Sequence, residues 1–238
     1  MTDTLKVGLA QLNPKVGDVA GNLAKVRAAR VEAGKQGADL VLTTELVLAG
    51  YFPEDLVLKP SFVKRCHEAV EELRADTMAG GPAVFVATPW AEDGKLYNAI
   101  VALQKGEIVG RRYKVDLPNY GVFDDKRVFS PGPMPGPLVF EGVRIGVPIC
   151  EDMWTPEVVE CVAETGGEIL LVANASPYEA GKSEIQRRYV ATAAWLVQRE
   201  LGDAPLGGAI DAANLAYLLV RVSESFTYAD LIAGEQPR

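Results

Sequence analysis

The chain has 238 residues, of which 48% are apolar and 24% charged, and it carries a formal net charge of −8 with a pI of about 4.9. This composition is typical of a globular protein with one sizeable core, and the acidic charge argues against binding to a nucleic-acid backbone. The single histidine and the three irregularly spaced cysteines argue against a histidine-rich metal site, a disulfide framework and a Ser-His-Asp triad.

The N-terminus is polar and leads directly into an apolar strand. Met1 to Lys6 contains no basic segment followed by an apolar one, so no signal peptide is expected. No apolar run reaches the length of about 18 residues that a membrane span needs. We therefore expect a chain of the reducing cytoplasm that has neither membrane nor nucleic acid as a partner.

The first part of the chain alternates short apolar runs with segments of helical spacing. Such an alternation of strands and helices is typical of an α/β fold. We predict strands over Leu5–Leu12, Leu40–Thr44 and Ala83–Ala87, and helices over Val19–Gln36 and from Phe62 to Thr77.

The middle of the chain predicts two β-hairpins separated by a long loop. The hairpins join 98–104 to 107–113 and 138–140 to 143–149, with turns at Lys105-Gly106 and Glu141-Gly142. Residues 116–137 are rich in Pro and Gly, and loops of this length are usually functional. Because hairpins are antiparallel, the sheets of this α/β fold should be mixed.

The last part of the chain is predicted only in outline. A helix should begin at Thr155-Pro156 and run to Glu164, and a strand should follow over 169–173. A further helix is expected over 184–199, whereas the apolar stretch 209–222 fits neither a helix nor a strand clearly.

Three polar residues of complementary chemistry stand where apolar strands end. Glu45 follows 40–44, Lys114 follows 108–113, and Cys150 follows 143–149. Ligands of open α/β sheets bind outside the carboxyl ends of the strands, so we expect these side chains to meet in one pocket.

Their chemistry is that of amide hydrolysis through a thioester. A carboxylate can take the proton of a thiol, and a nearby ammonium lowers the pKa of that thiol. Lys114 and a backbone N–H after Cys150 would stabilise the oxyanion, and Glu45 would protonate the leaving ammonia and later activate water. Taken singly, each residue has a plainer interpretation: Cys150 as a core residue, Glu45 as a carboxylate at a helix entry, Lys114 as a solvated strand end.

Four motifs together resemble the carbon–nitrogen hydrolase (nitrilase) superfamily with its Glu-Lys-Cys triad, and most of all its glutaminase branch, the amidase domain of glutamine-dependent NAD synthetases. They are Thr44–Leu46 continued by Gly50–Leu56, Tyr113–Asp124, Gly146–Trp154, and Asn174–Tyr178 continued by Gly181-Lys182. The motifs follow one another in the family's order, and the resemblance runs from about Leu5 to Arg188.

This resemblance implies a four-layer αββα sandwich and hydrolysis of glutamine to glutamate and ammonia. The amidase reaction would need no cofactor and no metal, and ATP and deamido-NAD would be used only by a separate synthetase domain. The resemblance also implies Glu45, Lys114 and Cys150 as catalytic residues, and Tyr51, Tyr120, Glu151, Trp154, Ser176 and Lys182 as substrate-binding residues.

Two departures from the family pattern bear on this interpretation. Asp125 stands where the family has a second glutamate, and its shorter side chain should support Lys114 less well. The family pattern also fades after Arg188, and no synthetase motif is visible. We therefore expect a carbon–nitrogen hydrolase domain over 1–200 and a divergent segment over 201–238, without a synthetase domain.

The sequence leaves three functions open. The first is a glutaminase, whose expected partners are glutamine, a synthetase and further copies of the chain in a homo-oligomer. The second is an amidase for another small amide or a ureido compound. The third is an inactive module that binds a synthetase or another partner, which the divergent end would favour.

Overall fold

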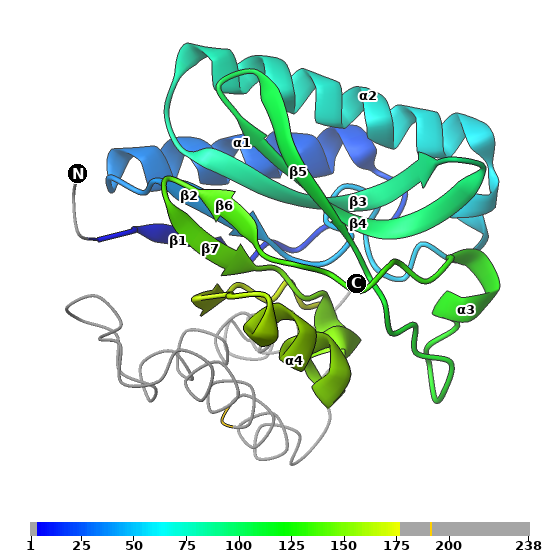
Figure 1. Cartoon of the computed structure of the whole chain (residues 1–238). Helices are drawn as coiled ribbons and strands as arrows, with labels where there is room; N and C mark the ends of the chain where they lie inside the picture. Colours follow the sequence, from blue (N-terminus) through cyan, green and yellow to red (C-terminus); the bar gives the residue numbers. More distant parts are fainter. Residues whose placement is uncertain (1–3, 177–190, 192–238) are drawn as a thin grey trace, which may run out of the picture.

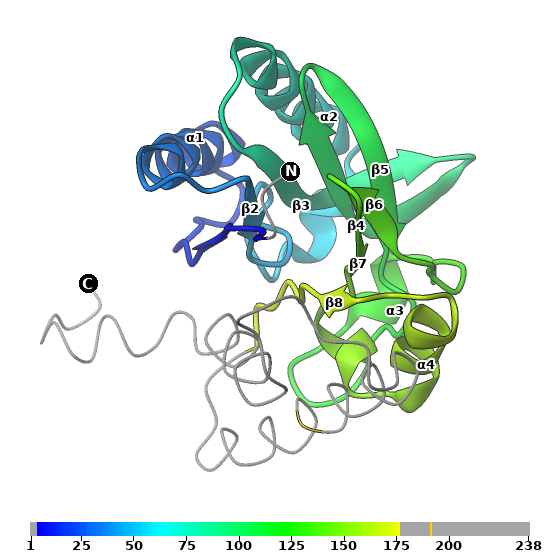
Figure 2. The ribbon, with the colours of Figure 1, turned by 60° about the vertical axis from the view of Figure 1, so that its left-hand side comes forward.

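The computed structural model describes residues 4–176 and residue 191, and the described residues form four layers in the order α, β, β, α (Figure 1). Helices α1 (Val19–Lys35) and α2 (Pro60–Asp76) cover the outer face of the first sheet. Figure 2 shows α4 (Pro156–Glu164) beyond the second sheet, on the opposite side of the molecule. The expected α/β fold, a four-layer sandwich with mixed sheets, is confirmed.

The first sheet has five strands in the order β1-β2-β3-β4-β5. The first three strands are parallel to one another, and β3, β4 and β5 are antiparallel. Their bounds are Val7–Ala10, Leu40–Thr43, Ala83–Glu92, Lys95–Gln104 and Glu107–Tyr113. This sheet thus combines crossovers through α1 and α2 with two hairpins.

The outer core lies between this sheet and the two helices. The side chain of Asp18 accepts a hydrogen bond from the N–H of Gly21 and caps α1, and Pro60 opens α2, where its missing N–H costs nothing. The apolar faces of the helices then bury Leu23, Val26, Cys66, Val70 and Leu73 against β3 and β4. Packing of this kind fixes the first sheet and therefore the ends of its strands.

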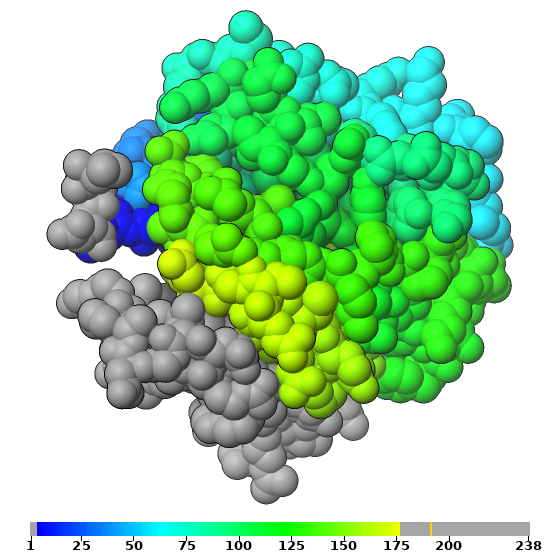
Figure 3. Space-filling model, viewed as in Figure 1, coloured from blue at the N-terminus to red at the C-terminus, as the bar shows by residue number. Residues whose placement is uncertain are grey.

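The second sheet has three strands, β6 (Leu138–Phe140), β7 (Val143–Gly146) and β8 (Ile169–Leu170). The inner core lies between the two sheets. There Leu42, Phe85 and Ile100 of the first sheet belong to one cluster with Ile145 of β7 and Ile149, which follows β7. In the space-filling view, the yellow-green segments of the second sheet lie directly against the green segments of the first (Figure 3).

The structure differs from several expectations about the elements, and strands β1 and β8 are both shorter than predicted. Strand β7 ends at Gly146 rather than at Ile149, because Pro148 has no N–H to donate to a ladder. Strand β3 continues past Ala87 to Glu92 and pairs with β4 in a hairpin that was not predicted. The long loop contains the short helix α3 (Asp125–Val128).

Three 3-10 helices complete the described chain: η1 (Glu54–Leu58), η2 (Thr77–Ala79) and η3 (Cys150–Met153). The expected helix over 184–199 and the unassigned stretch 209–222 lie outside the described residues, apart from residue 191, which is helical. Within residues 4–176, none of the helices has the length and apolarity that crossing a membrane requires.

Candidate active site

Glu45 lies two residues after the end of β2 and is fully buried. Its Oε1 accepts a hydrogen bond of 2.7 Å from Lys114 Nζ and one of 2.8 Å from Asn98 Nδ2. Its Oε2 is buried and has no hydrogen-bond partner among the described residues. One oxygen of Glu45 is therefore fixed, and the other is able to accept or give a proton.

Lys114 follows β5 directly, and its side chain is fully buried. Its N–H donates to the carbonyl oxygen of Asn98 at 2.8 Å, which fixes its backbone against β4. Its ammonium lies 2.7 Å from Glu45 Oε1 and 2.8 Å from Asp125 Oδ2. Burial alone would lower the pKa of Lys114, but electrostatic interactions with Glu45, Cys150 and Asp125, led by the charge of Glu45, raise it above its ordinary value, so the ammonium is charged.

Asp125 is the first residue of α3 and is 4% exposed. Besides Lys114, it accepts a hydrogen bond of 3.3 Å from the hydroxyl of Tyr51. Burial raises the pKa of Asp125, and the Lys114 ammonium opposes that rise. The shorter side chain at this position thus still reaches Lys114, because α3 brings the backbone close to it.

Cys150 opens the 3-10 helix η3 with a positive φ of 48°. Such a backbone conformation is strained for a residue with a side chain, and strain of this kind is concentrated at functional sites. The N–H of Cys150 donates to the carbonyl oxygen of Ala173 at 3.0 Å, and the N–H of Glu45 donates to the next carbonyl, that of Asn174, at 3.4 Å. Two consecutive carbonyl groups therefore hold the backbones of the thiol and the carboxylate side by side.

The thiol of Cys150 is buried and lies 3.7 Å from the hydroxyl of Ser176. Burial raises the pKa of Cys150 to about 12, and the charge of Glu45 raises it as well, whereas Lys114 and hydrogen bonds from Ser176 and Ala175 lower it. Carboxylate, ammonium and thiol are therefore within electrostatic reach of one another. At neutral pH the resting thiol is protonated and needs a base before it can attack.

Several buried polar atoms around Glu45 have no hydrogen-bond partner among the described residues. They are the hydroxyl of Thr44, Oε2 of Glu45, Oδ1 of Asn98 and both side-chain atoms of Asn174. A buried polar atom left without a partner costs about 1–3 kcal/mol, so proteins retain such atoms mainly where they serve a function. This concentration of unsatisfied atoms singles out the same place as the triad.

The expected substrate-binding residues lie in two groups. Tyr51 and Ser176 adjoin the triad, with the ring centroid of Tyr51 5.9 Å from Lys114 Nζ. Tyr120 is 57% exposed, and its hydroxyl lies 3.0 Å from both carboxylate oxygens of Glu151. Trp154 follows η3 and is half-buried. Lys182 lies outside the described residues.

Aromatic rings connect these two groups. Phe123 lies 5.4 Å from Tyr120, 5.6 Å from Phe52 and 6.4 Å from Tyr51, measured between ring centroids. The rings form an apolar wall that runs from the buried ammonium to the exposed Tyr120 hydroxyl. Phe52 and Phe123 belong to sequence motifs quoted above, but their place in this wall depends on the tertiary fold.

Sequence reasoning missed two polar residues that contact the triad or its neighbours. Asn98 is buried in β4 and binds Glu45, and an amide directly before the apolar stretch 99–103 was the signal that could have found it. Asp152 is 1% exposed and accepts hydrogen bonds from backbone N–H groups beside Lys114 and Cys150.

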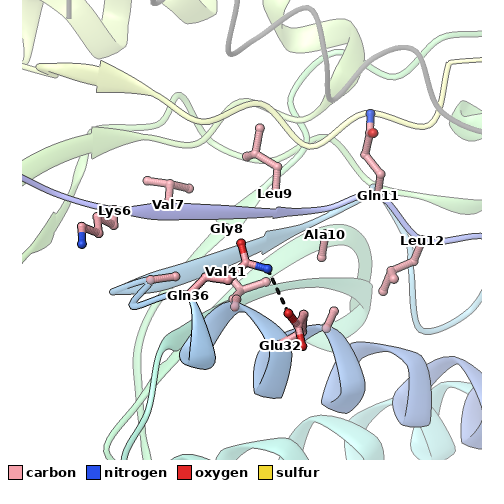
Figure 4. Close-up of a pocket in the computed structure, with 13 residues that line it drawn as sticks. Lys6, Val7, Gly8, Leu9, Ala10, Gln11, Leu12, Glu32, Gln36 and Val41 are labelled. Atoms are coloured by element: carbon pink, nitrogen blue, oxygen red, sulfur yellow. Dashed lines mark hydrogen bonds between the residues drawn. The ribbon is translucent and has the colours of Figure 1, made fainter. Parts of the chain in front are cut away.

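A separate hollow lies between β1 and α1, as the close-up shows (Figure 4). Its volume is about 390 Å³, and its polar side includes Gln36, which donates a hydrogen bond of 3.0 Å to Glu32. None of Glu45, Lys114 and Cys150 lines it. Among the described residues, no group of three or more His, Cys, Asp or Glu side chains is arranged to hold a metal ion.

The chain matches known proteins over most of its length. The model of the carbon–nitrogen hydrolase family matches residues 6–196, and a model of the tetracyclin repressor-like C-terminal domain matches residues 179–238. The glutamine-dependent NAD(+) synthetase of Rhodobacter capsulatus is 42% identical over 188 residues, which are 79% of this chain and 34% of that protein. The chain thus spans about a third of the length of this curated relative.

Two solved structures are similar in fold. The glutamine-dependent NAD+ synthetase of Acinetobacter baumannii, in complex with ADP, has a TM-score of 0.75 and 37% identity over 81% of this chain and 36% of its own. A variant of the amidase of Nesterenkonia sp. AN1, with acrylamide added to its active-site cysteine, has a TM-score of 0.72 and 26% identity over 80% of this chain and 74% of its own.

Proposed function

The chain belongs to the carbon–nitrogen hydrolase family, and from this premise we propose that it hydrolyses the side-chain amide of glutamine to glutamate and ammonia through a thioester at Cys150. The observation that carries the proposal is that the two carboxylate oxygens of Glu45 differ in their contacts. Lys114 and Asn98 hold Oε1, while Oε2 remains buried without a partner among the described residues.

The first half of the reaction forms the thioester. Oε2 of Glu45 takes the proton of Cys150, and the sulfur attacks the amide carbon to give a tetrahedral oxyanion, which the Lys114 ammonium stabilises. Glu45 then returns the proton to the nitrogen, the C–N bond breaks, and ammonia leaves. The raised pKa of the thiol makes this base necessary, because an unassisted thiol stays protonated at neutral pH.

The second half of the reaction consumes water. Glu45 accepts a proton from a water molecule, the oxygen attacks the thioester carbon, and the C–S bond breaks as the proton passes to the sulfur of Cys150. Glutamate leaves and the thiol is restored. Water is the only second reactant, so the proposed reaction runs on residues of this chain without a cofactor or metal.

Recognition of glutamine would use the two groups of side chains described above. The carboxylate of Glu151, paired with Tyr120, is suited to the α-ammonium of the substrate, and the aromatic wall to its methylene groups. Ser176 and Tyr51 would line the buried end beside the thiol. Trp154 and Lys182 complete the proposed set, with Lys182 assigned from the family resemblance alone.

The wider role follows from the curated relatives, of which this chain spans about a third. We propose that residues 1–200 form the hydrolase domain and that a synthetase uses the released ammonia to amidate deamido-NAD with ATP. On this proposal, 201–238 lie outside the hydrolase domain, and the protein works in the cytoplasm as a homo-oligomer.

The decisive measurement is ammonia release from glutamine by the purified chain and by Cys150→Ala. We expect steady release by the parent chain and none above background by the variant, with unchanged circular dichroism. Cys66→Ala is the matched control, because Cys66 is equally buried but belongs to the outer core, and it should keep its activity. Normal turnover by Cys150→Ala would refute the proposal.

A second candidate function is favoured by the likeness to the Nesterenkonia amidase. The similar region covers 74% of the amidase chain but only 36% of the Acinetobacter synthetase chain. The chain would then hydrolyse a different small amide or a ureido compound with the same triad. A panel of such substrates separates the two: turnover of another amide without turnover of glutamine would support this candidate. Absence of all turnover, together with no reaction of Cys150 with a glutamine-like diazo ketone, would favour an inactive binding module.

A further inference from the structure

One buried carboxylate connects the segment that carries Lys114 to the turn that carries Cys150. Asp152 is 1% exposed and lies in η3, two residues after Cys150. Its Oδ1 accepts the N–H groups of Val115 at 2.9 Å and of Asp116 at 2.8 Å. Its Oδ2 accepts the N–H of Ile149 at 3.0 Å.

These three donors are close in sequence to Lys114 and Cys150. Val115 and Asp116 directly follow Lys114, and Ile149 directly precedes Cys150. The ammonium and the thiol lie on different sheets of the sandwich, so no ladder of hydrogen bonds between neighbouring strands sets their separation. Asp152 supplies a direct link between the two backbones, because one of its oxygens binds the segment after Lys114 and the other binds the residue before Cys150.

We propose that Asp152 is a positioning residue that sets the place of the Cys150 sulfur relative to the Lys114 ammonium. This inference rests on the proposed thioester chemistry and adds a residue to it whose side-chain oxygens accept hydrogen bonds from backbone N–H groups. The carboxylate acts through backbone groups, and only its two acceptor oxygens satisfy all three donors.

Three N–H donors and the Lys114 ammonium favour the charged form of Asp152, and burial opposes it. The opposing effects leave the pKa of Asp152 raised to about 7, with burial the largest cause. A second link joins the same segments, because the hydroxyl of Thr155 donates to the side chain of Asp116. Two side-chain links thus restrict how the segment after Lys114 can move relative to the segment around Cys150.

Asp152→Asn is the sharpest test, because it keeps size and shape. Its amide cannot offer acceptors to all three N–H groups, so one donor or more loses its partner. We expect the alkylation of Cys150 by iodoacetamide at pH 8 to change at least about threefold and kcat for glutamine to fall about tenfold, with KM within about a factor of two. Mass spectrometry of the Cys150 peptide distinguishes this thiol from Cys66 and Cys161.

Two controls separate positioning from loss of stability. Asp39→Asn makes the same change at a carboxylate that binds the N–H of Lys6, before β2 and remote from the triad, and should leave both rates unchanged. Leu73→Ala lowers stability from within the outer core, and it should leave the alkylation rate of the folded protein unchanged. A folded Asp152→Asn protein with parental alkylation and kcat would overturn the proposal.

The alkylation measurement needs no substrate, so it stays informative if glutamine is not hydrolysed. If Asp152→Asn does not fold, Thr155→Val takes its place, because it removes the other link between the same two segments. We expect that variant to change Cys150 alkylation by about twofold or more. A parental rate in Thr155→Val would then overturn the proposal.

Discussion

The side-chain amide of Asn98 donates to the same oxygen of Glu45 that receives the ammonium of Lys114. Asn98 belongs to β4, whereas Glu45 follows β2, and β3 lies between these two strands in the sheet. The amide therefore reaches across β3, where Asn98 pairs with Pro89, and fixes the orientation of the carboxylate. A base that must receive and return protons at one oxygen gains from having the other oxygen held in this way.

Replacing Asn98 by leucine should release Glu45 without changing its charge. The hydrogen bond joins a neutral donor to a charged acceptor, and such bonds contribute about 1.5–3 kcal/mol. We expect kcat/KM for ammonia release to fall about 10- to 100-fold in Asn98→Leu. Asn22→Leu is the matched control: it removes a buried asparagine that binds Lys15 and Leu48, and it should lower stability while kcat of the folded protein is kept. Parental kcat/KM in Asn98→Leu would show that Glu45 needs no such support.

Asp125 should contribute to stability as well as to activity, because it shares the buried ammonium with Glu45. Asp125→Asn keeps the shape but removes one of the two charges that balance Lys114. We expect the free energy of unfolding, measured with urea, to fall by about 1.5–3 kcal/mol and turnover to fall with it.

Asp125→Glu tests whether the shorter residue suits this site. The longer side chain is that of the family pattern, but here α3 already brings Asp125 Oδ2 to 2.8 Å from Lys114. An extra methylene in filled space costs about 1–3 kcal/mol, so this variant should be less stable than the parent chain. A gain in both stability and turnover would mean that aspartate is a poor substitute.

The sequence suggests the proposed triad because each of its members follows an apolar run. Glu45, Lys114 and Cys150 follow strands, and the carboxyl ends of strands are where α/β proteins place their chemistry. The sequence motifs around these three residues did not reveal which other side chains would contact them. Asn98 and Asp152 make their contacts with residues 53 and 36–37 positions away. Strand pairing within the first sheet brings Asn98 to Glu45, and packing of the two sheets brings Asp152 to the segment after Lys114.

The errors in the strands also have physical causes. Pro89 discourages extension of β3 beyond Ala87, since proline cannot donate to a ladder. Among the described residues, β2 pairs only with Ala83 to Phe85 of β3, so the far half of β3 has no strand partner on that side and accommodates the proline. At Pro148 the error went the other way: the predicted strand was too long. It included Pro148, whereas β7 ends at Gly146.

The contact between Gly146 and α4 should be sensitive to a single methyl group. A Cβ at this position would lie 2.4 Å from Val162 Cγ1 and 2.7 Å from Leu170 Cδ2, far inside van der Waals distance. We expect Gly146→Ala to lower the free energy of unfolding by about 1–3 kcal/mol. Gly136→Ala is the matched control, because its nearest neighbour would be Thr165 Oγ1 at 3.8 Å. A smaller loss from Gly146→Ala in a Val162→Ala background than in the parent chain would confirm the steric cause, and an undisturbed Gly146→Ala protein would contradict it.

The charge of Glu45 disfavours the thiolate of Cys150 in the resting protein, which is opposite to the role proposed for Glu45 in turnover. Burial and the negative charge of Glu45 raise the pKa of Cys150, and Lys114 lowers it. Because the pKa is about 12, alkylation of the free protein should be slow at pH 7. Each added pH unit below that value raises the thiolate fraction about tenfold, and the alkylation rate should rise in proportion.

Glu45→Gln should therefore separate thiol reactivity from catalysis. The neutral amide removes a charge that disfavours the thiolate, so the pKa of Cys150 should fall and iodoacetamide should react faster at pH 8 than in the parent chain. Turnover of glutamine should fall by at least about 10³-fold, because the proton acceptor is lost. Glu32→Gln on the exposed side of α1 is the control and should change neither rate. Slower alkylation in Glu45→Gln would mean that Glu45 already holds the proton of Cys150 in the resting protein, and the order of proton transfer proposed above would have to be reversed.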